Sequence, residues 1–132
     1  MKKESSKELV KAYLKRADKA LVSAKILFKN DEMEDSASRA YYAMFYAAQA
    51  ILASKGLNAR SHKGARILFG RHIIREGLMG KDYAKMLDKA FDLRQRSDYE
   101  ALKKVTRDSV KDAIKSAEEF IKTVKQLSAF AD

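Results

Sequence analysis

Apolar residues recur at three- and four-residue steps along most of this chain, which is the spacing of a single stripe on an α-helix. The stripe of the first predicted helix consists of Leu9, Val10, Tyr13, Leu14, Ala17, Leu21, Ala24, Leu27 and Phe28. A second helix is expected from about Asp31 to Lys55, with cap chemistry from Asn30 and Asp31 and acidic side chains in its first turn. Gly56 can take the left-handed backbone conformation that ends such a helix.

The same spacing predicts three further helices in the second half of the chain. Ser61 is suited to cap the third helix, which Gly77 and Gly80 then end. The apolar face of this helix is formed by Ala65, Leu68, Phe69, His72 and Ile73. The fourth helix covers roughly Lys81 to Arg96, and the fifth starts near Thr106.

No stretch shows the period-two alternation of a half-buried strand, so the five amphipathic helices can bury their stripes only against one another. We therefore predict an all-α fold, an antiparallel up-and-down bundle of about five helices that forms a single domain over residues 1–132. A chain with 46% apolar residues, 35% charged residues and no proline is typical of a globular helical protein and not of a disordered one.

Composition removes several classes of function. The chain has no cysteine, which excludes disulfide frameworks, thiolate metal sites and cysteine nucleophiles and favours a cytoplasmic protein. With two separated histidines, we expect no metal site and no cofactor. The N-terminus runs into a charged amphipathic stretch, and the most apolar segment, Ala40 to Ala53, is too short to cross about 30 Å of hydrocarbon, so no export signal or membrane span is predicted.

The net charge of +10 is unevenly distributed along the chain. From Lys55 to Arg75 there are six basic side chains and no acidic one. A second basic stretch contains Arg94, Arg96, Lys103, Lys104 and Arg107. This distribution is consistent with an anionic partner such as a nucleotide or a nucleic acid, although a basic surface can also serve solubility alone.

The second predicted helix has two usable faces. One is an apolar stripe of Tyr41, Met44, Phe45, Ala48 and Leu52. The other combines charged, aromatic and amide side chains: Asp35, Arg39, Tyr42, Tyr46 and Gln49. Because an unpaired buried guanidinium costs several kcal/mol, Arg39 needs a partner, and Asp35 lies one turn earlier. Either these side chains satisfy one another at a helix contact, or they line a cleft or a dimer face.

A second cluster follows where the fourth helix ends, in the segment Arg94-Gln95-Arg96-Ser97-Asp98-Tyr99. The forked donors of two arginines suit phosphate binding, with Asp98 orienting one of them and Tyr99 beside it. The alternative is a salt bridge at the end of the bundle that a tyrosine covers.

The two histidines have different surroundings in the sequence. His62 stands at a helix start between Arg60 and Lys63, where free backbone N–H groups and nearby cations can hold a phosphate. His72 falls on the apolar face of its helix, which favours a core histidine. Arg66 and His72 are six residues apart, but a regular helix turns them about 120° away from each other, unless Gly70 breaks the helix or the two meet across a dimer.

These residues resemble the pattern of prokaryotic stand-alone HEPN domains (higher eukaryote and prokaryote nucleotide-binding). The resemblance covers about Tyr13 to Phe120. It depends on the block Ser38-Arg39-Ala40-Tyr41-Tyr42-Ala43-Met44-Phe45-Tyr46-Ala47-Ala48, on Gly56, His62, Phe69 and Gly77, and on the later Arg94-x-x-x-Asp98-Tyr99.

The resemblance implies a helical bundle that forms homodimers and has a nucleotide or RNA role. Many small members are the toxins of toxin–antitoxin systems, paired with a minimal nucleotidyltransferase, and others are metal-independent ribonucleases. The ribonucleases carry an arginine followed, after four to six residues, by a histidine at the start of a late helix. This chain departs from that pattern, because Asp98 and Tyr99 follow Arg94 and no histidine comes later.

Three hypotheses remain from the sequence. The first is a nucleotide- or RNA-binding HEPN homodimer that works beside a nucleotidyltransferase. The second is a ribonuclease toxin in which arginines stabilise the transition state and Arg94, Asp98 or His72 belongs to the catalytic group. The third is a structural helical interaction module. The expected nucleotide- or phosphate-binding residues are Arg39, Tyr42, Tyr46, Arg94, Arg96, Asp98, Tyr99 and His62.

Overall fold

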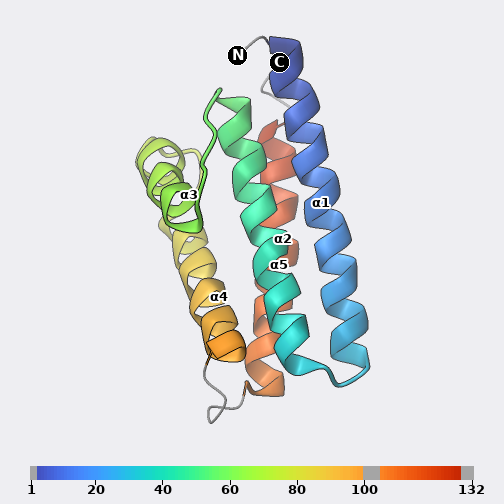
Figure 1. Cartoon of the computed structure of the whole chain (residues 1–132). Helices are drawn as coiled ribbons and strands as arrows, with labels where there is room; N and C mark the ends of the chain where they lie inside the picture. The colour runs from blue at the N-terminus through green and yellow to red at the C-terminus, as the bar shows by residue number, and fades with distance from the viewer. Residues whose placement is uncertain (1–2, 100–104, 129–132) are drawn as a thin grey trace.

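A computed structural model describes residues 3–99 and 105–128 of the chain, with the side chains of residues 3–5, 99 and 128 left aside. Its elements are α1 (Lys3–Lys29), α2 (Met33–Ser54), α3 (His62–Phe69), a π-helical turn η1 (Gly70–Ile74), α4 (Lys81–Tyr99) and α5 (Arg107–Ser128). There is no strand among these residues. The long helices α1, α2, α4 and α5 alternate in direction (Figure 1), so the predicted all-α, up-and-down bundle of five helices is confirmed.

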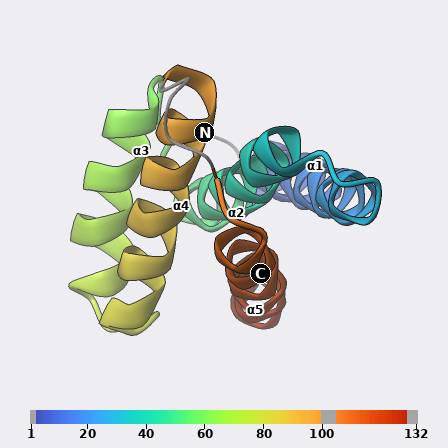
Figure 2. The same cartoon turned by 90° about the horizontal axis from the view of Figure 1, so that it is seen from below.

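Helix α2 is the centre of the bundle. Seen from below, it lies between α1 and α4, with α5 beneath it, while α3 and α4 stand together as an inclined pair (Figure 2). Many of its buried positions are alanines, including Ala40, Ala43, Ala47 and Ala50, which are all 0% exposed. Because alanine side chains are short, the backbones of neighbouring helices can approach α2 closely on more than one side.

The connection before α2 differs from the expectation. Asn30 and Asp31 belong to the end of α1: the Asn30 side chain donates a hydrogen bond to the carbonyl of Ile26, and Asp31 has a φ of 64°. Helix α2 starts after Glu32 with no side-chain cap. The prediction that Asn30 and Asp31 cap α2 was therefore wrong, because both residues close the preceding helix instead.

The connection after α2 follows the prediction. Gly56 has a φ of +75°, in the left-handed region that most residues with a Cβ adopt only rarely. The side chain of Gln49, expected on the polar face of α2, is 5% exposed and donates to the carbonyl of Ala59. Ser61 caps α3, since its hydroxyl accepts a hydrogen bond from the backbone N–H of Gly64 at 2.9 Å. These contacts fix the position at which α3 begins.

The third helix is not regular over its expected length. It changes at Gly70 into the π-helical turn η1, in which the N–H of Arg75 donates to the carbonyl of Gly70, five residues earlier. Gly77, with a φ of +80°, then ends the segment as predicted. Among the residues that the structure describes, no helix has both the length and the apolar character needed to span a membrane.

Candidate functional site

Arg94 lies near the end of α4, with its side chain directed into a group of aromatic rings. Its side chain is 15% exposed. The guanidinium carbon is 5.2 Å from the centre of the Tyr42 ring and 5.8 Å from that of Tyr41. A cation over an aromatic face is attracted by the ring quadrupole, by about 0.5–1 kcal/mol at exposed sites and more where water is excluded. The tyrosines of α2 therefore hold a largely buried cation supplied by α4.

Arg39 reaches the same ring from within α2. Its guanidinium carbon is 4.8 Å from the centre of the Tyr42 ring. Asp35, the partner available to Arg39 in the sequence, is exposed, and no ion pair joins the two in the part of the chain described. The face of Tyr42, one helical turn later, contacts the guanidinium of Arg39 instead. Two arginines that are 55 residues apart in sequence thus share one ring.

Asp98 stands one turn after Arg94 and pairs with it, as expected. Oδ2 of Asp98 is 3.1 Å from Nε of Arg94. The geometry is that of an ion pair without a hydrogen bond, because the buried Nε has no hydrogen-bond acceptor among the described residues. A buried donor left without an acceptor costs about 1–3 kcal/mol. Arg94 is therefore incompletely satisfied by the protein, and an anionic ligand can supply further acceptors to this guanidinium.

His62, the first residue of α3, lies inside the same group of rings. Its ring centre is 4.6 Å from that of Phe45 and 5.5 Å from that of Tyr41. Nδ1 lies 2.7 Å from the hydroxyl oxygen of Tyr41. Either the hydroxyl donates to Nδ1, or an Nδ1–H donates to the hydroxyl oxygen, according to the tautomer. In the second arrangement the other ring nitrogen, Nε2, is an acceptor.

Burial and charge set the protonation of this pair. Burial, with the Arg94 cation nearby, lowers the pKa of His62 below its usual value of 6.5. Burial raises the pKa of the Tyr41 hydroxyl well above its usual 10.0, and the attraction of Arg94 for a phenolate only partly offsets this. Near neutral pH the cluster therefore combines a neutral imidazole, a neutral phenol and the arginine cations.

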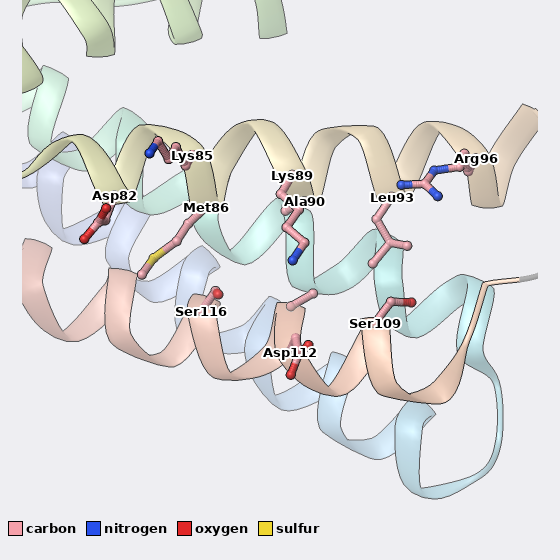
Figure 3. A pocket seen from close by; sticks show the side chains of 11 residues that line it. Asp82, Lys85, Met86, Lys89, Ala90, Leu93, Arg96, Ser109, Asp112 and Ser116 are labelled. Atoms are coloured by element: carbon pink, nitrogen blue, oxygen red, sulfur yellow. The ribbon is translucent and has the colours of Figure 1, made fainter.

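The other residues expected at the site divide into two groups. Tyr46 lies next to the ring that both arginines contact, since its ring centre is 5.9 Å from that of Tyr42. Arg96 lies away from these rings, because it is on a different face of α4 from Arg94. It lines a groove of about 340 Å³ between α4 and α5, near Leu93 and Ser109 (Figure 3). The side chain of Tyr99 lies outside the described residues.

Helix α3 separates the second histidine from the cluster. His72 is in the π-helical turn and is only partly buried, so the expectation of a core histidine is not met. Arg66 stacks over Phe91 at 4.6 Å and pairs with Asp88 at 3.1 Å. No interaction joins Arg66 to His72 within the described part of the chain. The helix does change into a π-helical turn at Gly70, but this change does not bring Arg66 and His72 together in one site.

Sequence reasoning missed Tyr41 as a site residue. The sequence placed Tyr41 on the apolar stripe of the second helix, and it is indeed 0% exposed. A buried tyrosine needs a hydrogen-bond partner for its hydroxyl, and this requirement is the one signal that could have pointed to a polar group such as His62 beside it. His62 lies beside Tyr41 because the connection between α2 and α3 folds back along α2. No local sequence pattern predicts the path of this connection.

The named residues form what we call the Arg94 cluster: Arg39, Tyr41, Tyr42, His62, Arg94 and Asp98. The guanidinium groups of Arg39 and Arg94 stack on aromatic rings. The Nη donors of both arginines make no hydrogen bond to the described residues. Such donors suit a phosphate, because forked N–H groups match its oxygens. The fold and this cluster define an all-helical protein in which two arginines from different helices stack on one tyrosine ring of the central helix.

Comparison with known proteins identifies the family to which this chain belongs. A model of the HEPN domain matches residues 10–127. The chain therefore belongs to the HEPN domain family, which confirms the resemblance found in the sequence.

Its relatives come from several microorganisms. A protein of Methanocaldococcus jannaschii named "Putative toxin MJ0605" is 35% identical over 91% of this chain and 89% of its own length. A "UPF0332 protein" of Thermotoga maritima is 32% identical over 91% of both chains. A second protein of Methanocaldococcus jannaschii, "Putative toxin MJ0142", is 25% identical over 86% of this chain and 77% of its own length.

Proposed function

We propose that this protein is the toxin component of a toxin–antitoxin pair, a HEPN homodimer that binds RNA or nucleotide phosphate through the Arg94 cluster. In this proposal a minimal nucleotidyltransferase is its protein partner. The observation that carries the phosphate-binding part is the convergence of Arg39 and Arg94 on the single ring of Tyr42, at 4.8 and 5.2 Å. The names of two relatives support the toxin part.

Physical chemistry favours a phosphate over a neutral ligand at this position. The two guanidiniums come from different helices; Arg94 is paired with Asp98, whereas Arg39 has no carboxylate partner among the described residues, so the pair of arginines keeps a net positive charge. The chain as a whole carries a net charge of +10, which attracts a polyanion over longer distances. Tyr46, which is partly exposed beside Tyr42, offers ring surface on which a base can stack.

A binding assay with two arginine variants tests this function. We expect Arg94→Gln and Arg39→Gln each to weaken the binding of a fluorescently labelled oligouridine of about 12 nucleotides by roughly ten-fold, since each removes a contact to phosphate. The measurement is fluorescence polarisation at low salt. The control is Arg75→Gln, which removes the same charge from an exposed position at the end of η1. Binding by both variants equal to that of the control would contradict the proposal.

A second function, metal-independent RNA cleavage, is favoured by one specific observation. Arg94 and His62 both lie against Tyr41, with the guanidinium 5.8 Å and the imidazole 5.5 Å from its ring centre. The histidine that the sequence lacks after Arg94 is thus supplied by α3. Neutral His62 with its proton on Nδ1 can accept the 2′-hydroxyl proton at Nε2 while that oxygen attacks phosphorus and the bond to the 5′-oxygen breaks. The leaving 5′-oxygen takes a proton from solvent, and Arg94 stabilises the transition-state charge.

An RNA-cleavage assay in the presence of EDTA separates binding from cleavage. If the second function holds, wild-type protein and His72→Gln cleave and His62→Gln does not, although His62→Gln still binds RNA. If no protein cleaves while the arginine variants lose binding, the binding function stands alone. Loss of cleavage only in His72→Gln would assign the cleavage to Arg66 and His72 and contradict the role of His62.

A further inference from the structure

A second basic surface lies beside the Arg94 cluster, in the groove between α1 and α2. This groove has a volume of about 320 Å³ and is lined by Arg16, Lys19, Ala20, Ser23, Arg39 and Tyr46. The four residues from α1 follow one another at steps of three, one and three, so they form a single face of that helix. We call this surface the α1–α2 groove. Arg39 belongs both to this groove and to the Arg94 cluster.

The charges of the α1–α2 groove are all positive. No acidic side chain lines it, and Arg16, Lys19 and Arg39 form no ion pair within the described residues. Asp18 lies next to Lys19 in sequence, but it is engaged elsewhere, because both of its carboxylate oxygens are 2.8 Å from Nζ of Lys125. The acid closest in sequence is therefore already paired with a residue of α5. The positive charge of the groove has no such carboxylate partner among the residues that the structure describes and can attract an anionic ligand.

Aromatic rings connect the α1–α2 groove to the Arg94 cluster. The guanidinium of Arg16 lies 5.9 Å from the centre of the Tyr46 ring, and the rings of Tyr13 and Tyr46 stack with centres 6.4 Å apart and an angle of 23° between their planes. Tyr46 is in turn 5.9 Å from Tyr42, the ring that Arg39 and Arg94 share. Cations and phenol rings thus form a continuous series from α1 across α2 to α4.

We propose that the α1–α2 groove binds a segment of single-stranded RNA that continues into the Arg94 cluster. Arg16 and Lys19 contact neighbouring phosphates and the ring of Tyr46 stacks on a base, which is how proteins hold single strands without reading their sequence. A single nucleotide leaves most of this series of cations unused, because one phosphate group reaches only one part of it. This inference rests on the proposed function and names its ligand as a strand longer than one nucleotide.

The test compares variants of the groove with variants of the cluster. The double variant Arg16→Gln/Lys19→Gln is expected to weaken binding of a labelled oligouridine of about 12 nucleotides roughly ten-fold at low salt. The slope of log Kd against log salt concentration should fall by about 1.4, since each phosphate contact to a single strand contributes about 0.7. Tyr46→Leu should weaken binding by about five-fold without changing that slope, because it removes a stacking surface and no charge.

The control is Lys111→Gln/Lys115→Gln, which removes two exposed charges from α5. If the groove double variant behaves like this control while Arg94→Gln still weakens binding, the groove proposal is overturned and the proposed function stands. If the groove double variant weakens binding and Arg94→Gln does not, the RNA site is the groove alone and the proposed cluster site fails. Wild-type binding by all variants overturns both. Competition by uridine monophosphate that is equally strong in wild type and groove variant is expected, since one nucleotide does not need the groove.

Discussion

At the scale of single residues, the site is assembled from groups that need one another. Arg94 requires an environment that compensates its largely buried charge, and Tyr41, Tyr42 and Asp98 provide it. The pairing of Arg94 with Asp98 could be predicted from sequence because both residues lie one turn apart on one helix. The contact of His62 with Tyr41 spans 21 residues and depends on the path of a connection, so the sequence could not reveal it.

The protonation of His62 leads to a prediction about pH. Because burial and Arg94 lower its pKa in the folded protein, the unfolded chain binds more protons than the folded one once the pH falls to about the usual 6.5. The contribution of His62 to the free energy of unfolding is therefore fully present above about pH 6.5. This contribution is lost as the pH falls from 6.5 through the lowered pKa of the folded protein. Acidic side chains that titrate in the same range contribute equally to wild type and to His62→Gln.

We expect the free energy of unfolding to fall more between about pH 7.5 and about pH 5 in wild type than in His62→Gln. Urea denaturation at both pH values, followed by circular dichroism, measures the two differences. A drop in stability of the same size in both proteins would contradict the lowered pKa of His62.

At the scale of elements, the ends of helices were more predictable than their regularity. The left-handed φ of Gly56 and the cap at Ser61 follow from local chemistry, and both are found where the sequence placed them. Gly70 marked in the sequence a position where the third helix could break, but nothing local indicated that the break takes the form of a π-helical turn with a hydrogen bond five residues back. Phe69 and Ile73, on either side of this change, are both buried in the core.

The cap of α3 leads to a prediction about an element. Ser61→Ala removes the hydroxyl that accepts from the N–H of Gly64, and we expect it to lower the free energy of unfolding by about 1 kcal/mol. Ser61→Asp keeps an acceptor in this position and should retain most of the stability. Urea denaturation of the three proteins measures the change. A loss in Ser61→Asp as large as that in Ser61→Ala would mean that the cap is not the cause.

At the scale of the whole molecule, five amphipathic stripes were sufficient to predict the class of fold. Helix α2 uses both of the faces that the sequence predicted, because it lies at the centre of the bundle. Tyr41, on the apolar face, is buried in the core, and Arg39, on the polar face, contacts the ring of Tyr42. The α1–α2 groove could not be predicted, because it results from how two helices pack and from which of their lysines and arginines then face each other. Sequence patterns specify the faces of helices, whereas grooves and shared rings depend on the packed assembly.

The packed assembly also decides which interactions hold the bundle together. Phe120 of α5 is 0% exposed, and its ring lies 5.4 Å from that of Phe69 at the end of α3 and 5.9 Å from that of Tyr83 in α4. The ion pair of Lys125 with Asp18 also joins two helices, at 2.8 Å, but its side chains remain 46% and 49% exposed. Water screens such a pair, so it contributes about 1 kcal/mol at most.

We therefore expect Phe120→Ala to lower the free energy of unfolding by about 3–5 kcal/mol and Lys125→Gln by about 1 kcal/mol or less. Phe120→Leu keeps most of the apolar volume and should lose clearly less than Phe120→Ala. Urea denaturation measures all three, and added salt should reduce only the difference between Lys125→Gln and wild type, since salt screens exposed charges. If Lys125→Gln proved as damaging as Phe120→Ala, ion pairs between α1 and α5 would hold the bundle together to a degree that their exposure does not explain.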